Sequence, residues 1–213
     1  MNPSCWFFLR LSMIKNEKEM SQPNYRDLLM ELGLSITQID DLLVQFNSIE
    51  IAKGQHFLKV GDVFDDMFIL TQGALRFYYL TPDGDESNKL FLFENDLSFP
   101  VAPIARDKPS LFGIVACENT RLSQLPFHQF KQRLLSLQVW DAFYLTYLEW
   151  LADAKIAREH HLLTSNKSQL IEDLAATEPQ IYSRISDYHI ASYLGMSPVT
   201  FSRLKRRVTE AQR

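Results

Sequence analysis

The residues that most clearly suggest a chemical role are four cations within five positions, Arg203, Lys205, Arg206 and Arg207. A guanidinium can donate two hydrogen bonds to O6 and N7 of guanine, and clustered cations bind the phosphates of a nucleic acid. Residues 184–213 contain six Lys/Arg and two Asp/Glu, a net charge of +4, whereas residues 1–183 contain 16 and 24, a net charge of −8. This asymmetry suggests that only the basic segment contacts a polyanion.

The sequence around these cations, ISDYHIASYLGMSPVTFSRLKRR, predicts two short helices joined by a tight turn. Ser186 or Asp187 can cap the first helix, and Gly195 permits the left-handed backbone that turns the chain. Ser197 followed by Pro198 is a strong start signal for the second helix. Apolar residues on the two helices can pack against each other: Ile190, Leu194, Phe201 and Leu204. This spacing is typical of a helix-turn-helix.

In this interpretation the second helix enters the major groove of DNA by its N-terminal part, and its basic end holds phosphates. We expect Arg203 to contact a guanine, and Thr200 and Ser202 to reach a phosphate or a base edge. The full predicted DNA-binding set is Ser197, Thr200, Ser202, Arg203, Lys205, Arg206 and Arg207. The alternative is a structural hairpin with a solvated basic end, and the localised charge favours DNA binding over it.

The segments that must position this hairpin change character along the chain. Apolar spacing between residues 25 and 46 predicts two helices separated at Gly33, the second capped by Ser35 or Thr37. From residue 49 to about 125 the chain is rich in aromatic and branched residues, with turn signals such as Pro82-Asp83-Gly84 and Asn95-Asp96. Short strands at this spacing predict a sandwich or barrel, with two of the strands at 111–116 and 121–125.

A long helical pattern without Gly or Pro follows, and it includes DAFYLTYLEWLADAKIAREHHLL. Residues on one face recur three or four apart, close to a heptad seam: Leu145, Leu148, Ala152 and Ile156. A second apolar face can pack on the strands. We therefore predict a helix that pairs with a second copy of the chain, the alternative being a helix buried on several sides of one monomer. The polar stretch TSNKS, residues 164–168, is a plausible hinge.

Composition narrows the classes of protein. The chain has 213 residues, of which 46% are hydrophobic and 23% are charged, as in ordinary globular proteins. Two distant cysteines, Cys5 and Cys117, argue against a disulfide framework, a zinc site or a four-cysteine cluster, and favour the cytoplasm. The apolar stretch near the start is interrupted by Arg10, and we expect no membrane contact. Residues 1–20 are expected to be an extension, with Met20 as a possible natural start.

Three segments in the strand region and the hairpin together resemble the CRP/FNR superfamily of bacterial transcription regulators. The strand segments are KGQHFLKVGD, MFILTQGALRFYYLTPDGDE and ACENTRLSQLPFHQF, in order and at the family's spacing. The most specific segment is RISDYHIASYLGMSPVTFSRLKR. The resemblance implies an α+β protein with a double-stranded β-roll (jelly-roll or cupin-like) sensor, a long dimerisation helix and a C-terminal helix-turn-helix without a clear β-wing.

This resemblance also implies a domain plan and partners. We expect an extension at 1–20, an effector-sensing β-roll at 21–130, a dimerisation helix at 131–163 and a DNA-binding domain at 164–213. Proteins of this type act as homodimers on two half-sites about one turn of DNA apart. Double-stranded DNA and a second copy are therefore the expected partners, with RNA polymerase as a further one. Val199 occupies a position that is acidic in the cyclic AMP receptor, so the operator should differ.

The sequence departs from the family where cyclic-AMP-binding members hold the phosphate. Phe99-Pro100 stands in place of Gly-Glu, and Ser110-Leu111 in place of Arg-Ser. Pro100 removes a donor N–H and Leu111 supplies none, so we expect no tight binding of a cyclic nucleotide and no response to cyclic AMP. The effector is unknown and no cofactor is expected. The predicted effector-pocket residues are Phe99, Pro100, Arg106, Ser110 and Leu111.

Two other classes of function are alternatives to a regulator of transcription. A β-roll module could act on a protein partner while the basic hairpin is only structural, and salt-dependent binding to duplex DNA distinguishes this alternative. A cupin-like metal enzyme needs clustered His and carboxylate ligands on paired strands. The strand region offers only His56, and the five histidines of the chain form no recognisable ligand set for a metal or haem. We therefore expect the chain not to be an enzyme.

Overall fold

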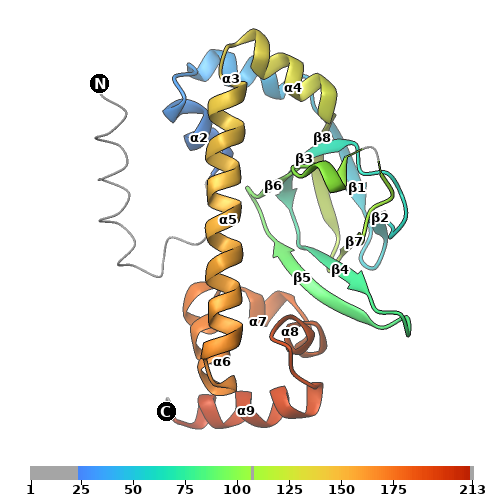
Figure 1. The fold of residues 1–213 in the computed structure, drawn as a ribbon, viewed down its shortest axis with the longest axis vertical. Coiled ribbons are helices and arrows are strands. Elements are labelled where there is room, and N and C mark those ends of the chain that lie inside the picture. The colour runs from blue at the N-terminus through green and yellow to red at the C-terminus, as the bar shows by residue number, and fades with distance from the viewer. Residues whose placement is uncertain (1–23, 107, 212–213) are drawn as a thin grey trace.

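The computed structural model describes residues 24–106 and 108–211, so the expected extension at 1–20 lies outside the described residues. Two short helices, α2 (Tyr25–Glu31) and α3 (Ile36–Leu43), come first. The sequence predicts Ser35 or Thr37 as the cap of α3, and the structure has Ser35, which forms a capping box with Gln38. A β-roll follows, then two helices and a group of four short helices at the opposite end of the molecule (Figure 1).

The β-roll consists of two four-stranded antiparallel sheets, in the orders β1-β8-β3-β6 and β2-β7-β4-β5. The inner faces of the two sheets enclose a core of branched and aromatic side chains that includes Phe68, Leu75 and Ile114. The strands predicted at 111–116 and 121–125 correspond to β7 and β8. The strands are β1 (Asn47–Ile51), β2 (His56–Leu58), β3 (Asp66–Gln72), β4 (Leu75–Leu80), β5 (Glu86–Leu92), β6 (Leu97–Ser98), β7 (Phe112–Ala116) and β8 (Thr120–Pro126).

The predicted long helix at 131–163 is in fact two helices, α4 (Phe127–Ser136) and α5 (Trp140–Thr164). The break lies at Gln138, which has a left-handed φ of 59°. Its N–H donates to the carbonyl of Leu135, and the N–H of Val139 donates to that of Leu134, at 3.0 Å each. This bonding satisfies the last carbonyls of α4. The domain boundary predicted at residue 130 therefore falls inside α4, and the long helix begins at Trp140.

Aromatic packing fixes α5 against one face of the β-roll. Phe143 and Tyr147 of α5 are 1% and 4% exposed. The ring of Tyr147 lies 4.7 Å from the ring of Phe99, and Phe99 is stacked on Phe127 at 5.5 Å. Since α5 has 25 residues, it is roughly 37 Å long and runs past the whole β-roll (Figure 1).

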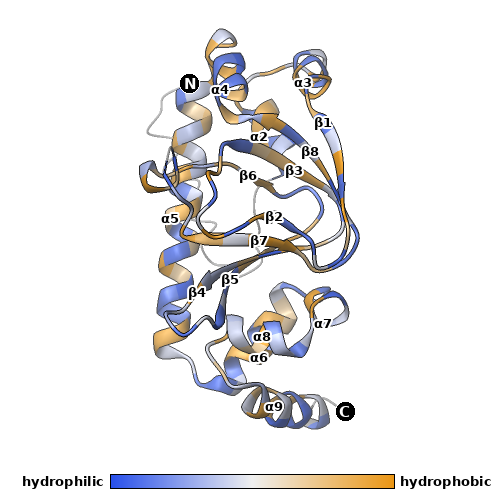
Figure 2. Cartoon of the chain, turned by 90° about the vertical axis from the view of Figure 1, so that its right-hand side faces the viewer, coloured by the Kyte–Doolittle hydropathy of each residue, from blue (hydrophilic) through white to orange (hydrophobic). Residues whose placement is uncertain are grey.

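The four C-terminal helices share an apolar core that continues onto Ala74, Phe91 and Phe93 of the β-roll. They are α6 (Lys167–Thr177), α7 (Ile181–Arg184), α8 (Asp187–Tyr193) and α9 (Pro198–Ala211). Their shared core contains Ile171, Ile190 and Phe201, of which the last two are fully buried. The unit lies against the end of the β-roll that carries β4 and β5, with α9 farthest from the strands (Figure 2). None of the helices in the described part of the chain has both the length and the apolar character that a membrane span requires.

Gly73 lies between β3 and β4, where the backbone packs closely against Asn119. Its φ is +100°, and an added Cβ would lie 2.8 Å from the backbone oxygen of Asn119. We expect Gly73→Ala to lower the free energy of unfolding by about 2–5 kcal/mol, because a left-handed residue and an overpacked contact are both unfavourable. The matched control is Gly84→Ala, since Gly84 has a φ of +88° but no atom within 4 Å of the added Cβ. Urea denaturation measures both, and an equal loss in the two variants would contradict the close contact.

Candidate functional site

The predicted helix-turn-helix is formed by α8 and α9. Gly195 has a left-handed φ of 65°, and the N–H of Met196 donates to the carbonyl of Ala191 at 2.9 Å. Ser197 caps α9 by accepting from the N–H of Thr200 at 3.2 Å. Ala191 is fully buried, which allows α8 and α9 to approach closely. Ser197 and Pro198 therefore mark the start of α9, as the sequence predicts.

The inner face of α9 is apolar and its outer face is basic. Phe201 is fully buried and its ring is stacked on that of Tyr182, with centroids 6.4 Å apart. Arg203 and Arg207 are exposed and form no hydrogen bond or ion pair with other described residues. Val199, beside them near the start of α9, is 81% exposed.

The other predicted DNA-binding residues are less free than these arginines. Lys205 is half-buried, forms an ion pair with Asp187 at 2.7 Å and lies over the ring of Tyr182. Arg206 is exposed and faces Glu210 at 3.8 Å within α9. Thr200 accepts a hydrogen bond from Ser197 at 2.9 Å. Ser197 and Ser202 are exposed.

An arginine bridge holds the C-terminal unit on the β-roll. Arg184 of α7 donates to both carboxylate oxygens of Glu94, at 2.7 and 2.8 Å, and to Glu118 at 3.0 Å. Its guanidinium also lies 5.0 Å from the ring centroid of Phe93. The hydrogen bonds from Arg184 lower the pKa of Glu94 to about 2. Glu94 therefore stays ionised, and the bridge stays intact, across the whole physiological pH range.

Asn88 of β5 makes a second contact between the two units. Its backbone N–H donates to Ser192 Oγ and its side-chain amide donates to the carbonyl of His189, at 3.0 Å each. Its side-chain oxygen accepts from Arg76, which also pairs with Glu86 at 2.6 Å. Asn88 is 3% exposed, so α8 is attached to β5 by hydrogen bonds that water does not screen.

Three of the five predicted effector residues do not line a pocket. The guanidinium of Arg106 is occupied by the carbonyl of Pro100 at 2.9 Å and by the hydroxyl of Tyr144 at 2.6 Å, and it also donates to the carbonyl of Val101. Ser110 is 3% exposed, and its hydroxyl donates to the carbonyl of Phe112 at 2.8 Å. Arg106 and Ser110 therefore stabilise the loop itself.

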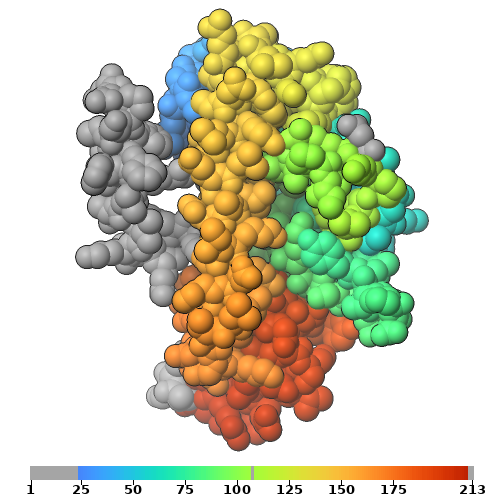
Figure 3. Space-filling model, viewed as in Figure 1, coloured from blue at the N-terminus to red at the C-terminus, as the bar shows by residue number. Residues whose placement is uncertain are grey.

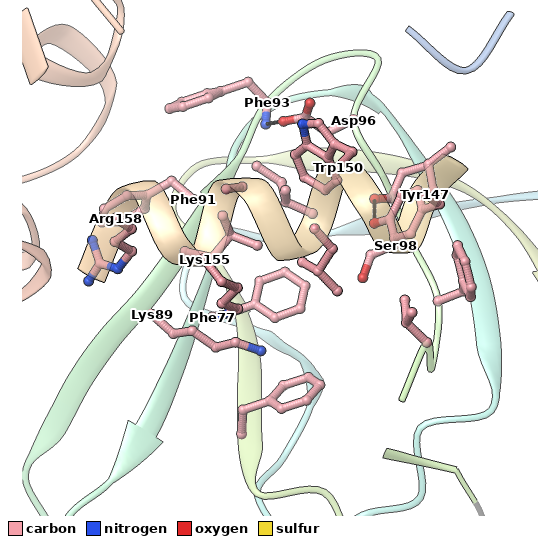
Figure 4. Close-up of a pocket in the computed structure, with 18 of the residues that line it drawn as sticks. Phe77, Lys89, Phe91, Phe93, Asp96, Ser98, Tyr147, Trp150, Lys155 and Arg158 are labelled. Carbon is pink, nitrogen blue, oxygen red and sulfur yellow. Dashed lines mark hydrogen bonds between the residues drawn. The ribbon is translucent and has the colours of Figure 1, made fainter. Parts of the chain in front are cut away.

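A pocket does open close to this loop, and Phe99 and Leu111 belong to its wall. Its volume is about 700 Å³, within the usual range for small-molecule sites. The wall is contributed by β4 and β5, by residues 97–105, by α5 and by the C-terminal unit (Figure 4). Aromatic side chains dominate it, among them Phe77, Phe91 and Trp150. The pocket therefore lies between the β-roll, the long helix and the helix-turn-helix unit.

Three cations that the sequence reasoning missed also line this pocket: Lys89 of β5, and Lys155 and Arg158 of α5 (Figure 4). Burial and the nearby charge of Lys155 lower the pKa of Lys89 to about 8. The pKa of Lys155 is lowered by burial and by the charge of Arg158. The alternation of β5 does not identify Lys89, because the pairing of β5 with β4 shifts its register at this residue. No signal in the sequence pairs it with α5.

Comparisons with known proteins agree with this architecture. Residues 48–136 match the family of cyclic nucleotide-binding domains. A comparison with curated protein sequences finds no match. The described histidine, cysteine and acidic residues include no group of three or more that could hold a metal ion.

Several solved structures share the fold at low sequence identity. A mutant of CooA from Carboxydothermus hydrogenoformans superposes with a TM-score of 0.65 at 16% identity, over 86% of this chain and 84% of that chain. CLP of Xanthomonas campestris, described as a c-di-GMP-responsive global regulator, gives 0.64 at 12% identity, over 84% and 93%. The catabolite activator protein of Thermus thermophilus gives 0.52 at 20% identity, over 84% and 86%.

The fold defines a class of architecture: an antiparallel β-roll joined by one long helix to a helix-turn-helix unit. The match to a cyclic nucleotide-binding domain over residues 48–136 and the fold shared with the solved structures agree with the β-roll that the sequence motifs indicate. The predicted α+β fold class is likewise confirmed.

The partly buried ammonium of Lys89 should affect the pH dependence of stability. The pKa of Lys89 is about 8 in the folded protein and about 10.5 when unfolded. Between these pH values the unfolded chain binds more protons than the folded protein does. The penalty that Lys89 imposes on folding should therefore fall, and the free energy of unfolding should rise, from pH 8 to pH 10.5. The groups around Lys89 are the Tyr79 hydroxyl on β4 and the cations Lys155 and Arg158 on α5, with Glu94, Asp96 and Glu178 elsewhere on the pocket wall.

We expect Lys89→Met to melt above the wild type at pH 7, and the difference to shrink as the pH rises through this window. Thermal denaturation at several pH values measures the difference. Lys59→Met, at an exposed position outside the pocket, is the control. Parallel curves for the wild type and Lys89→Met would contradict the burial of a charged Lys89.

Proposed function

We propose that this chain is a homodimeric, sequence-specific DNA-binding regulator of transcription that acts in the cytoplasm. The observation that carries the proposal is the outer face of α9, where Arg203 and Arg207 are exposed and unpaired among the described residues. A helix of this shape, with a free N-terminal part and cations along one side, fits the major groove of duplex DNA. The acidic remainder of the chain leaves α9 as the natural contact for a polyanion.

The basic residues of α9 differ in the contacts with DNA that we expect them to make. Arg203 lies one and a half turns into α9 with its guanidinium free, which suits a bidentate contact to guanine. Lys205 is held by Asp187 at 2.7 Å, so a phosphate would have to compete with or join this pair. Arg206 and Arg207 are exposed and suit phosphate contacts. Contact with RNA polymerase is a further prediction of the resemblance.

Dimerisation through α5 is supported by the exposure of one apolar face of the helix. Leu145 and Ile156 are 58% and 65% exposed, and Ala152 is also exposed, while Leu148 is half-buried. In Figure 3 one side of α5, coloured yellow to orange, lies at the surface along most of its length. A second copy of α5 would remove these apolar side chains from water and place two α9 helices on one DNA.

A response to cyclic AMP is not part of the proposal. Pro100 has no N–H to offer a phosphate, and the hydroxyl of Ser110 is occupied by the carbonyl of Phe112. Leu111 is exposed and supplies no donor. The phosphate of a cyclic nucleotide would therefore lack the paired donors that its burial requires.

Selection of bound sequences from a random duplex pool, followed by titration, tests the reading helix. We expect Arg203→Ala to weaken the selected site by about 1–3 kcal/mol and to relax the preference at one base pair. Lys205→Ala should weaken all duplexes alike, and the affinity of the wild type should fall steeply with salt. Lys59→Ala is the control, since Lys59 is an exposed cation outside α9. Equal effects of Arg203→Ala and Lys205→Ala on random DNA would contradict base reading, and salt-insensitive or absent binding would favour a β-roll module without DNA.

Introducing negative charge on the exposed apolar face of α5 tests the dimer. We expect Leu145→Glu combined with Ile156→Glu to give a monomer by light scattering, because four carboxylates would face each other in the seam. Circular dichroism should be unchanged, since both side chains are exposed in one copy. Val44→Glu is the control, because Val44 is 84% exposed but lies at the end of α3. A wild type that is monomeric, or a double variant that stays dimeric, would contradict the seam.

A further inference from the structure

The pocket combines an apolar wall with cations that have no acidic partner. Five other Lys and Arg residues of the described chain form ion pairs with carboxylates on other elements: Arg26, Arg76, Arg121, Arg184 and Lys205. No such pair among the described residues involves Lys89, Lys155 or Arg158. Lys89 and Arg158 are partly buried and Lys155 is exposed on the same pocket wall. Like charges placed close together on one wall are unfavourable, and an anion between them would reduce this cost.

Lys89 shows where the anion would lie. Its ammonium is 4.2 Å from the ring centroid of Phe112 and 5.7 Å from that of Phe77, so it projects over apolar surface rather than into open water. Figure 4 shows Lys89 and Lys155 approaching the same part of the pocket from the strand and from the helix. A single anionic group between the two ammonium groups would contact both.

The carboxylates of the pocket wall lie in a different part of it. Asp96 accepts from the N–H of Phe93 at 2.7 Å, and burial raises its pKa to about 7. Figure 4 shows Phe93 and Asp96 beside Trp150, on the other side of α5 from Lys89. Glu94 is neutralised by Arg184. The remaining carboxylate of the wall, Glu178, comes from the segment that follows α6. The pocket is therefore polarised, with its basic part at Lys89, Lys155 and Arg158.

Between these two parts the wall is apolar and aromatic. Phe91, Leu151 and Ala154 contribute to it from β5 and α5. The indole Nε1 of Trp150 is buried and has no hydrogen-bond acceptor among the described residues, so one donor in the wall is also unused. A ligand that suits this lining has an extended apolar body and a negatively charged head.

We propose that the pocket binds a small amphiphilic monoanion, an aliphatic or aromatic carboxylate, whose head group lies between Lys89 and Lys155 and whose apolar body packs on the aromatic wall. A cyclic nucleotide fits this lining poorly, because its polar sugar and base would face Phe91, Leu151 and Trp150. The ligand class thus follows from the side chains of β5 and α5 rather than from the loop at residues 99–111.

Arg158 connects this site to the helix-turn-helix. It donates to the carbonyl of Tyr193 at 2.9 Å, and its guanidinium lies 4.0 Å from the centroid of the Tyr193 ring. Tyr193 is the last residue of α8, and its ring also packs on Phe91 at 5.3 Å. An anion that draws Arg158 toward itself competes with this contact and changes how α8 is held. This regulatory part of the inference rests on the proposed DNA binding, whereas the binding of the anion does not.

Thermal shift and calorimetric titration of the full chain test the binding with octanoate, decanoate and dodecanoate, each below its micellar concentration. We expect at least one of these acids to raise the melting temperature, with decan-1-ol weaker and decylamine without effect. Lys89→Met combined with Lys155→Met should lower the affinity for the acid about ten- to a hundred-fold, since charge-assisted contacts are lost while the apolar wall is kept. Lys59→Met should bind as the wild type does.

Each outcome bears on the proposal. Equal binding of decanoate and decan-1-ol, unchanged binding to the double Met variant, or no shift with any of the acids would overturn it. Tighter binding of cyclic AMP than of every acid would also overturn it. Higher melting of the unliganded double variant than of the wild type verifies that the variant folds and that the two cations are unfavourable without a ligand.

A DNA titration separates this inference from the proposed function. Decanoate should change the DNA affinity of the wild type. It should leave unchanged the DNA affinity of the double variant that combines Lys89→Met with Lys155→Met. If the chain binds the acid but no duplex, the proposed function fails while the anion site stands. If it binds DNA but none of the acids, the anion site fails while the proposed function stands.

Discussion

The aromatic packing of α5 against the β-roll is the contact on which the other parts of this structure depend. Phe143 and Tyr147 are almost fully buried against Phe99 and its neighbours, so the helix cannot roll or slide without opening the core. Once this face is fixed, the positions of the remaining faces follow from the helical period. One of them lines the pocket with Lys155 and Arg158, and another exposes Leu145 and Ile156 to solvent.

The C-terminal unit is held by apolar contacts, which include Phe91 and Phe93 of the β-roll, and by directional polar contacts. Its contacts with the β-roll include the bridge from Arg184 to Glu94 and Glu118 and the hydrogen bonds of Asn88 to α8. Directional polar contacts of this kind are satisfied in one arrangement and lost in others, whereas a broad apolar interface tolerates small shifts. In the proposed regulation, replacing one of these contacts would change how the unit is held. The contact of Arg158 with Tyr193 is suited to this role, because it borders the pocket.

The pocket contains two lysines whose positive charges are unfavourable for the fold. Lys89 and Lys155 stabilise no carboxylate among the described residues, and burial lowers the pKa of both. Such pairs of depressed lysines are more common at functional sites than in structural cores. Their retention in an otherwise apolar wall is understandable if an anion completes the site. The same reasoning explains why Arg106, which the backbone carbonyls of residues 100 and 101 already satisfy, is structural.

The sequence by itself determined those features that depend on neighbouring residues. The turn at Gly195, the cap at Ser197 and the apolar residues of α9 lie within a few positions of one another, so local patterns predicted the hairpin and its basic face. The break between α4 and α5 escaped prediction because Gln138, unlike a glycine, gives no signal of a left-handed residue. Only the tertiary structure brought Lys89 on β5 together with Lys155 on α5 and left them unpaired, because the packing of a helix across a sheet joins side chains that no spacing along the chain relates.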